Sequence, residues 1–401
     1  MINLYIKDRK LFQLSEQIQR MSPSMTVEIS NLAKKLKTEG KDVLSFSVGE
    51  PDFDTPMPIN EAAKQAIDDK FTRYTAVDGI EPLKSAIASY LKKRHHVDYE
   101  TNEISVGAGA KHSLFNLFAA LLNEDDEVII PAPYWVSYPE LVTYFGGKSV
   151  CVDTTAEEGF KLTADKLKNS ITPKTKILVL CTPSNPTGSV YSKTELKELA
   201  QVLKDTNVIV IADEIYDRLV FDDLEFASAV SISEDMQKRT ILVNGVSKFA
   251  AMTGWRMGFF ACKDKTLVKT ISGFQSNVTT NINSITQIAC IKAFDGSIDA
   301  DVENMRQVFE KRRNLGCELF DKVEGLKVSK SQGSFYLFVD CSAVEPDSLL
   351  FCKKLLEEES VALVPGVAFG KDGYFRFSFA TSDENIKQGI ARISRFVSTY
   401  K

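Results

Sequence analysis

The chain has 401 residues, of which 44% are hydrophobic and 26% charged, a composition typical of globular proteins with a large core. Its formal charge is −5 and it has no basic tract, which argues against a nucleic-acid partner because phosphate binding needs clustered cations. No apolar run reaches the ~18 residues of a membrane span and no signal-peptide core follows the N-terminus, so we expect neither a membrane partner nor secretion.

Cysteine and histidine content narrows the chemistry further. The seven cysteines are scattered without a CxxC pair, which is typical of buried thiols in a reducing compartment and not of a disulfide scaffold or a zinc site. Only three histidines are present, so we also expect no histidine-rich metal centre. The sequence therefore predicts a cytoplasmic protein without a bound metal.

Along the chain, the first regular pattern is helical. Residues 15–40 carry apolar side chains near helical spacing, and residues 43–48 read as a short strand. Gly-Glu-Pro-Asp-Phe at 49–53 follows this strand and is expected to form a loop.

Between about residues 100 and 250, apolar strands alternate with amphipathic helices. The predicted strands are 103–106, 127–130, 177–181, 208–212 and 240–244, and the predicted helices between them include 113–122 and 193–204. The last three strands are nearly continuous apolar runs, which favours parallel strands covered by helices on both faces. The fold class predicted for this part is a layered α/β sheet.

After residue 300 the pattern becomes α+β. Helices are predicted over 301–320 and 348–359, and strands over 326–328, 335–339 and 375–378. We therefore expect three units: an N-terminal segment (1–55) packing with the small domain, a large domain (56–295), and a small C-terminal domain (296–401).

Polar residues follow the apolar strands directly. Asn185 comes after the strand 177–181, Asp213 and Tyr216 after 208–212, and Lys248 after 240–244, with Arg256 eight residues beyond the lysine. Because ligands of open α/β sheets bind beyond the carboxyl ends of the strands, an amide, a carboxylate, a phenol and an amine are expected at one edge.

A glycine-rich loop adds an anion site to this edge. Residues 107–111 (Gly-Ala-Gly-Ala-Lys) join the strand 103–106 to a helix, where backbone N–H groups and the helix N-terminus suit a phosphate. Each of these features is common in purely structural roles, but one cofactor would use all of them. Pyridoxal 5′-phosphate needs a lysine amine, a carboxylate for its ring nitrogen and a phosphate cradle, and Pro133-Tyr134-Trp135 offers an aromatic plate for its ring.

Two other nucleotide-type folds fit poorly. A P-loop is absent, because the Gly-Lys-Ser at 147–149 has Val142 in the position of the first glycine. A dinucleotide fingerprint starting at Gly107 has His112 at the third glycine position, which makes a nicotinamide dehydrogenase a poor candidate.

With these motifs in place, the chain resembles the fold-type I, class I aminotransferases over essentially its whole length, and most closely the aspartate aminotransferase branch found in many bacteria. The resemblance is carried by Gly49–Pro56, Tyr74-Thr75, Gly109–Lys111, Pro133–Trp135, Asn185–Gly188, Asp213–Tyr216, Ser247-Lys248, Met252–Arg256 and Arg376. It implies the three-layer fold of pyridoxal-phosphate transferases, with a large, mainly parallel sheet domain and a small α+β domain.

The resemblance also implies a role for each matching residue. Lys248 is expected to form the Schiff base with the cofactor and to carry the proton of transamination. The other expected cofactor contacts are Asp213 at the ring nitrogen, Tyr216 and Asn185 at the ring oxygen, Trp135 stacked on the ring, and Gly109, Ala110, Lys111, Ser247 and Arg256 around the phosphate. Tyr74 is expected to reach the phosphate from the second subunit of a homodimer with shared active sites.

For the substrate, the resemblance implies a carboxylate clamp formed by Arg376 with help from Gly49, Asn185 and Trp135. Residues 277–283 contain no arginine for a side-chain carboxylate, and Lys111, with Thr26 at the mouth of the site, is expected to take that role. The expected reaction is transfer of the amino group from aspartate to 2-oxoglutarate, giving oxaloacetate and glutamate. Prephenate or aromatic keto acids, a carbon–sulfur β-lyase activity and a regulator that no longer transaminates are the alternatives.

Overall fold

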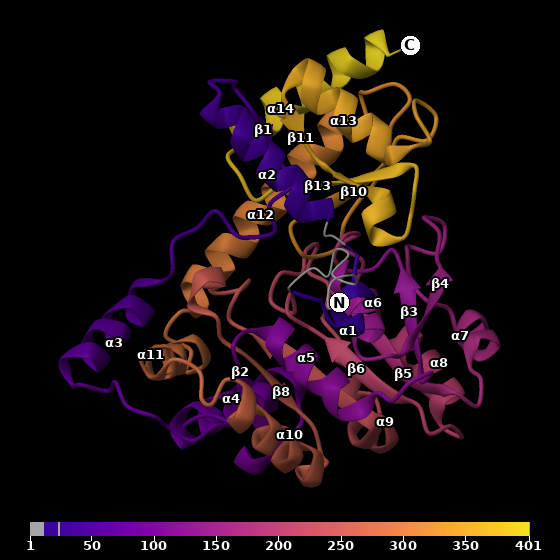
Figure 1. Ribbon diagram of the computed structural model, residues 1–401. Helices are drawn as coiled ribbons and strands as arrows, with labels where there is room; N and C mark the ends of the chain where they lie inside the picture. The colour runs from indigo at the N-terminus through magenta and orange to yellow at the C-terminus, as the bar shows by residue number, and fades with distance from the viewer. Residues whose placement is uncertain (1–11, 23–24, 401) are drawn as a thin grey trace, which may run out of the picture.

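Two large β-sheets organise the chain (Figure 1). The computed structural model describes residues 12–22 and 25–400. From edge to edge, the seven strands of the larger sheet are β2 (Ile104–Gly107), β8 (Gly258–Ala261), β7 (Thr240–Gly245), β6 (Ile209–Asp213), β5 (Thr175–Cys181), β3 (Glu127–Ala132) and β4 (Lys148–Asp153). Only β8 runs antiparallel to its neighbours, so the prediction of an α/β fold with a mainly parallel sheet is confirmed.

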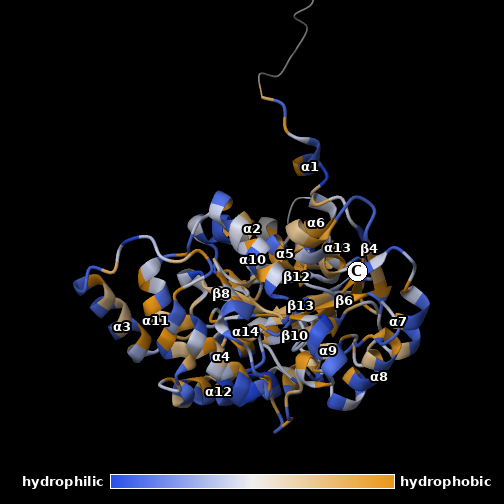
Figure 2. Ribbon diagram, turned by 90° about the horizontal axis from the view of Figure 1, so that it is seen from below, coloured by the Kyte–Doolittle hydropathy of each residue, from blue (hydrophilic) through white to orange (hydrophobic). Residues whose placement is uncertain are grey.

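Helices cover both faces of this sheet. One face carries α5 (Ala110–Leu121), α6 (Ser137–Tyr144) and α10 (Lys265–Val278). The other carries α7 (Ala164–Ser170), α8 (Lys193–Leu203) and α9 (Glu234–Arg239), together with α3 (Met57–Asp68), α4 (Glu81–His95) and α11 (Ser284–Phe294) towards the β2 edge. Figure 2 shows the apolar strands enclosed by helices with hydrophilic outer faces.

The continuous apolar runs of the strands follow from this double cover. In β5, Ile177 and Val179 pack against the α5 side, whereas Leu178 and Leu180 pack against the α8 side. Because successive side chains of a strand point to opposite faces, both sets must be apolar and no polar alternation is left in the sequence.

The smaller sheet lies above the larger one in Figure 1 and contains the C-terminal strands. Its order is β12 (Val364–Pro365), β13 (Tyr374–Ser378), β10 (Tyr336–Asp340) and β9 (Lys327–Ser329), and α12 (Asp299–Phe320), α13 (Ser348–Glu359) and α14 (Asp383–Thr399) lie around it. The strands and helices predicted in this region match these elements to within two residues at each end.

An N-terminal segment is built into this smaller part. Strand β1 (Leu44–Ser45) pairs in parallel with β11 (Val361–Ala362), and the ring of Phe46 stacks on Phe377 with centroids 4.2 Å apart. A Cβ at Gly389 in α14 would lie 2.2 Å from the Phe46 ring, so only glycine lets the helix approach this closely.

The helical prediction for residues 15–40 is confirmed. The described part of this range contains two helices, α1 (Glu16–Gln19), which lies beside α6 and stands out from the body in Figure 2, and α2 (Met25–Thr38). Pro23 lies between them, and a proline lacks the N–H of a helical hydrogen bond and disfavours helical backbone in the residue before it. The strand predicted over 43–48 is shorter, at Leu44–Ser45. Within residues 12–22 and 25–400, no helix is both long and apolar enough to cross a membrane.

Candidate active site

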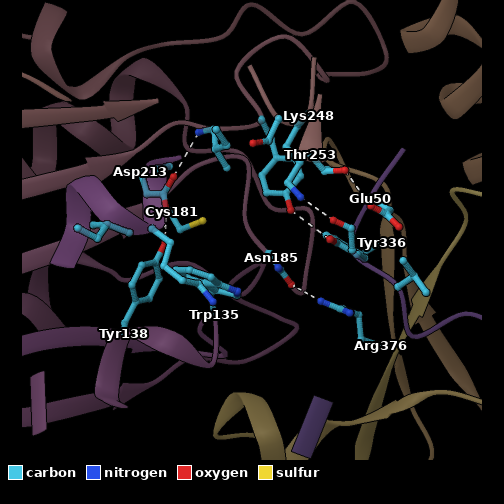
Figure 3. A pocket seen from close by; sticks show the side chains of 18 of the residues that line it. Glu50, Trp135, Tyr138, Cys181, Asn185, Asp213, Lys248, Thr253, Tyr336 and Arg376 are labelled. Carbon is cyan, nitrogen blue, oxygen red and sulfur yellow. Dashed lines mark hydrogen bonds between the residues drawn. The ribbon is translucent and has the colours of Figure 1, made fainter. Parts of the chain in front are cut away.

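A cavity of about 470 Å³ lies beyond the carboxyl ends of β5, β6 and β7, where the two sheets meet (Figure 3). This volume is in the range of small-molecule sites. Of the residues singled out in the sequence, those lining it are Gly49, Ala110, Lys111, Trp135, Asn185, Asp213, Tyr216, Ser247, Lys248, Arg256 and Arg376. The structure therefore brings together groups from both sheets.

Lys248 follows β7 and points into this cavity. Its Nζ donates a hydrogen bond to the backbone oxygen of Gly49 at 2.5 Å. Burial, followed by the positive charge of Arg376, lowers the pKa of Lys248 to about 8. A lysine with such a pKa is partly unprotonated near neutral pH and can act as a nucleophile or a base.

Asp213 ends β6 and is buried at 4% exposure. Its Oδ2 accepts a hydrogen bond from the Tyr138 hydroxyl at 2.7 Å, and its Oδ1 accepts from the backbone N–H of Ile215 at 3.3 Å. Burial raises the pKa of Asp213, and the hydrogen bond from Tyr138 opposes this rise. Within the described part of the chain, no lysine or arginine forms an ion pair with this carboxylate, so its charge is available to a cationic ligand.

An anion site lies at the N-terminus of α5. Gly109 caps the helix with φ +90°, and a Cβ there would lie 2.6 Å from Nη2 of Arg256. That arginine is held by hydrogen bonds to the backbone oxygens of Thr253 (3.0 Å) and Ala108 (3.3 Å). The missing side chain lets the guanidinium approach the free N–H groups of the helix start, which together favour a phosphate.

Arg376, on β13 of the smaller sheet, faces the same cavity. One nitrogen of its guanidinium donates to Asn185 Oδ1 at 2.9 Å and another to the backbone oxygen of Ser47 at 2.8 Å. Its Nε has no partner among the described residues although it is buried. The guanidinium lies 4.3 Å from the ring centroid of Tyr336, whose hydroxyl is 3.1 Å from that of Tyr216.

Lys111 is a further cation of the cavity. Its Nζ lies 4.8 Å from the ring centroid of Trp135. Partial burial, followed by the charge of Arg256, lowers the pKa of Lys111. No acidic side chain of residues 12–22 or 25–400 is recorded in an ion pair with it, so its charge also awaits an anionic partner.

Comparison with known proteins gives the family. The model of the family "Aminotransferase class I and II" matches residues 41–393. The chain belongs to this family.

Individual relatives cover almost the whole chain. An aspartate aminotransferase of Bacillus sp. (strain YM-2) is 42% identical over 96% of this chain and 99% of its own length. A probable aspartate/prephenate aminotransferase of Rickettsia bellii (strain RML369-C) is 43% identical over 95% of this chain and 98% of its own length. A solved structure of aspartate aminotransferase from Thermus thermophilus with maleate superposes with a TM-score of 0.92 at 38% identity, covering 96% of this chain and all (100%) of that one.

Aminotransferases of this family use pyridoxal 5′-phosphate, and the cavity fits that group. The unpaired, buried carboxylate of Asp213 suits a protonated ring nitrogen, and the amine of Lys248 suits an aldehyde. The glycine-made gap beside Arg256 suits the phosphate. When bound, the cofactor supplies an electrophilic carbon and a ring that withdraws electrons from the substrate Cα.

Two sequence-predicted residues, Gly109 and Tyr74, are not among those that line the cavity. Gly109 is the N-cap of α5 beside Arg256, and the side chain of Tyr74 is 88% exposed. The side chain of Thr26 lies outside the described residues. Conversely, the cavity contains residues outside the motifs, namely Tyr138, Cys181 and Tyr336, and Glu50 and Thr253 line it from within motifs that assigned them no role. Tyr138 lies three residues after Trp135, and predicting the helix α6 at this position would have placed the two side chains near each other.

Tyr138→Phe should weaken the binding of pyridoxal phosphate by about three- to tenfold, the net value of one typical hydrogen bond. Without the hydroxyl, the pKa of Asp213 rises further, so the carboxylate is less ionised at a given pH. The loss should therefore be larger at pH 6 than at pH 8, measured by absorbance titration of the apoenzyme with the cofactor.

The matched control is Tyr191→Phe, a buried tyrosine whose hydroxyl accepts a hydrogen bond from the backbone N–H of Leu162. This variant should bind the cofactor as the unaltered enzyme does. An equal loss for Tyr138→Phe at both pH values would show that the hydroxyl does not act through the ionisation of Asp213.

Proposed function

We propose that the chain is an aspartate aminotransferase, which moves the amino group of L-aspartate to 2-oxoglutarate and gives oxaloacetate and L-glutamate. The observation that carries this proposal is the placement of two cations, Arg376 and Lys111, in the cavity that holds Lys248, neither of which has an acidic partner among residues 12–22 and 25–400. A dicarboxylic amino acid offers one carboxylate to each. The names of the relatives and the dicarboxylate maleate in the Thermus structure support this assignment.

The cofactor contacts follow the geometry of the cavity. Asp213 would hold the ring nitrogen, Tyr216 and Asn185 the ring oxygen, and Trp135 the face of the ring. The backbone of Gly109, Ala110 and Lys111 would hold the phosphate together with Ser247 and Arg256. Glycine at 109 is essential in this arrangement, because a larger residue would push the guanidinium away.

Lys248 is the proposed catalytic residue. With a pKa of about 8, part of the amine is unprotonated near neutral pH, so Nζ would be able to take a proton from the substrate Cα and return it. The hydrogen bond from Lys248 Nζ to the backbone oxygen of Gly49 would hold the protonated amine in a fixed position.

Arg376 would bind the substrate α-carboxylate. Two of its nitrogens are already engaged by Asn185 and Ser47, which fixes the plane of the guanidinium. A planar fork held in this way suits the bidentate recognition of a carboxylate, and the Gly49 N–H and the side chains of Trp135 and Asn185 would complete the contacts. The second carboxylate would lie at Lys111, with Thr26 near the entrance.

Prephenate is a second candidate amino-group acceptor. The Rickettsia bellii relative is named a probable aspartate/prephenate aminotransferase. Prephenate also carries two carboxylates, so the same pair of cations would receive it.

We also propose the division of the chain into units. Residues 56–295 form the large domain, since the larger sheet lies within 104–261, and residues 296–401 form the small domain around the smaller sheet. Residues 1–55 would pack with the small domain, as the pairing of β1 with β11 supports. The seven cysteines are all free, which supports a reducing, cytoplasmic location.

A homodimer with shared sites is proposed from the position of Tyr74. This side chain is 88% exposed although the next residue, Thr75, is held in place by a hydrogen bond that its hydroxyl accepts from Gln287 at 2.9 Å. Apolar side chains on α3 and α10 are exposed as well, namely Met57, Ile67, Phe274 and Val278. Such residues are typical of a surface that a second subunit covers, and Tyr74 would reach the phosphate site of that subunit.

The function is tested by the visible spectrum of the purified holoenzyme. Aspartate should shift the absorbance of the bound cofactor and 2-oxoglutarate should restore it, because the two half-reactions run in opposite directions. Lys248→Ala should bind the cofactor without the lysine-linked absorbance and should lose turnover by at least about 10³-fold. Normal turnover in this variant, or a spectrum that ignores aspartate, would refute the proposal.

Lys111→Ala should raise the KM for aspartate about tenfold or more and leave the KM for alanine within about twofold, since only aspartate has a second carboxylate. The measurement is steady-state kinetics with each donor. Lys174→Ala is a suitable control, because Lys174 lies on the surface before β5 and does not line the cavity. Equal losses for both donors would show that Lys111 serves the cofactor and not the substrate side chain.

The shared site is tested by complementation. When Lys248→Ala and Tyr74→Ala chains are co-expressed, half of the dimers are mixed, and each mixed dimer has one site with both residues intact. About a quarter of the activity of the unaltered enzyme should therefore return. If Tyr74 served its own chain, the mixed dimers would show no gain over the two variants measured separately.

A further inference from the structure

A pair of tyrosine hydroxyls links the two sheets inside the cavity, and Figure 3 labels one of the two residues, Tyr336. Tyr216 follows β6 of the larger sheet and Tyr336 lies on β10 of the smaller one, and their oxygens are 3.1 Å apart. Both side chains are buried, at 3% and 0% exposure. The contact is a hydrogen bond in which either hydroxyl can be the donor.

The surroundings of Tyr336 limit where its proton can point. The face of its ring is covered by the guanidinium of Arg376, which carries only donors. On another side Gly49 approaches so closely that a Cβ there would lie 2.9 Å from the hydroxyl oxygen. Tyr216 is the hydrogen-bond partner that the structure records for this hydroxyl.

Each tyrosine has a single proton to donate. Under the proposed function, Tyr216 gives its proton to the ring oxygen of the cofactor. It then has none for Tyr336, so Tyr336 must be the donor in the contact between them. A hydroxyl that accepts a hydrogen bond becomes a stronger donor itself, since hydrogen bonds in a chain polarise one another.

The ring of Tyr336 also supports the carboxylate clamp. Arg376 lies opposite Phe338 in the pairing of β10 with β13, and Tyr336 is two residues from Phe338, on the same face of the sheet. Tyr336 is thus the diagonal neighbour of Arg376, and its ring centroid is 4.3 Å from the guanidinium carbon. At this distance a cation is attracted to the face of an aromatic ring.

We propose that Tyr336 is a positioning residue with two functions: its hydroxyl donates to Tyr216 and so directs the Tyr216 proton to the ring oxygen of the cofactor, and the face of its ring holds Arg376 in place for the substrate carboxylate. This inference rests on the proposed function, because it assigns Tyr216 to the ring oxygen and Arg376 to the α-carboxylate. The titratable groups that act on Tyr336 are Arg376, Tyr216 and Cys181.

The first function is tested on the holoenzyme by titrating the visible absorbance of the bound cofactor against pH. A donor to the ring oxygen stabilises the unprotonated form of the bound cofactor, so a weaker donor raises the midpoint. Tyr336→Phe, which removes only the hydroxyl, should raise the midpoint by about 0.3 to 1 pH unit. In the background of Tyr216→Phe, the same change should produce no further shift, because Tyr336 acts through Tyr216.

The second function is tested by the affinity of the holoenzyme for maleate. Tyr336→Phe keeps the ring and should bind this dicarboxylate within about twofold of the unaltered enzyme, whereas Tyr336→Leu should bind it about tenfold more weakly. The control is Tyr400→Phe, a tyrosine whose hydroxyl donates to Glu345 away from the cavity, which should change neither quantity.

The outcomes separate this inference from the function on which it rests. If the unaltered enzyme shows no lysine-linked absorbance or ignores aspartate, the proposed function fails. A different outcome is that the unaltered enzyme behaves as proposed while Tyr336→Phe leaves the midpoint unchanged or lowers it. That result, or an equal shift in the Tyr216→Phe background, would refute the action of the Tyr336 hydroxyl through Tyr216. Equal maleate affinities for Tyr336→Phe and Tyr336→Leu would refute the support of Arg376.

Discussion

The parallel direction of β5, β6 and β7 is the constraint on which the site depends. In register, Cys181 at the end of β5 lies opposite Asp213 at the end of β6, so the segments that follow these strands leave the sheet at one edge. Asn185, Asp213 and Lys248 are far apart in sequence, yet each stands just beyond such an end. The apolar cover on both faces keeps the strands rigid, and rigid strands hold polar groups at fixed distances.

Positive charge is the second property that gives the cavity its character. Four cations line it, Lys111, Lys248, Arg256 and Arg376, and they face the acids Asp213 and Glu50. Repulsion among them contributes to the lowered pKa values of both lysines. An anionic ligand offsets this repulsion. The excess of positive charge that helps to lower the pKa of Lys248 therefore also favours the binding of a phosphate and a dicarboxylate.

Sequence reasoning found five strands of the larger sheet and the residues at their carboxyl ends, because continuous apolar runs and the motifs after them are local features. It did not find β4 or β8. It did not reach Tyr138 or Tyr336. Tyr138 lies on α6, a helix of 8 residues that the periodicity did not reveal, and Tyr336 lies in a strand whose residues are nearly all buried. In such a strand the apolar pattern does not tell which side chain faces a cavity. The approach of the smaller sheet to the larger one depends on contacts between distant segments, so local patterns did not indicate it and it was expected only through the resemblance, which placed Arg376 in the same site as Asn185.

The short N-terminal strand has a mechanical consequence. Pairing of β1 with β11 forms a separate two-stranded sheet, the stacking of Phe46 on Phe377 joins this segment to the smaller sheet, and Ser47 O is bonded to Arg376. Gly49 O, only two residues later, is the atom that holds the amine of Lys248 on the larger sheet. The oxygen that binds Arg376 and the oxygen that binds Lys248 thus belong to one short segment, so a shift of Arg376 towards a carboxylate would also displace the acceptor of the amine.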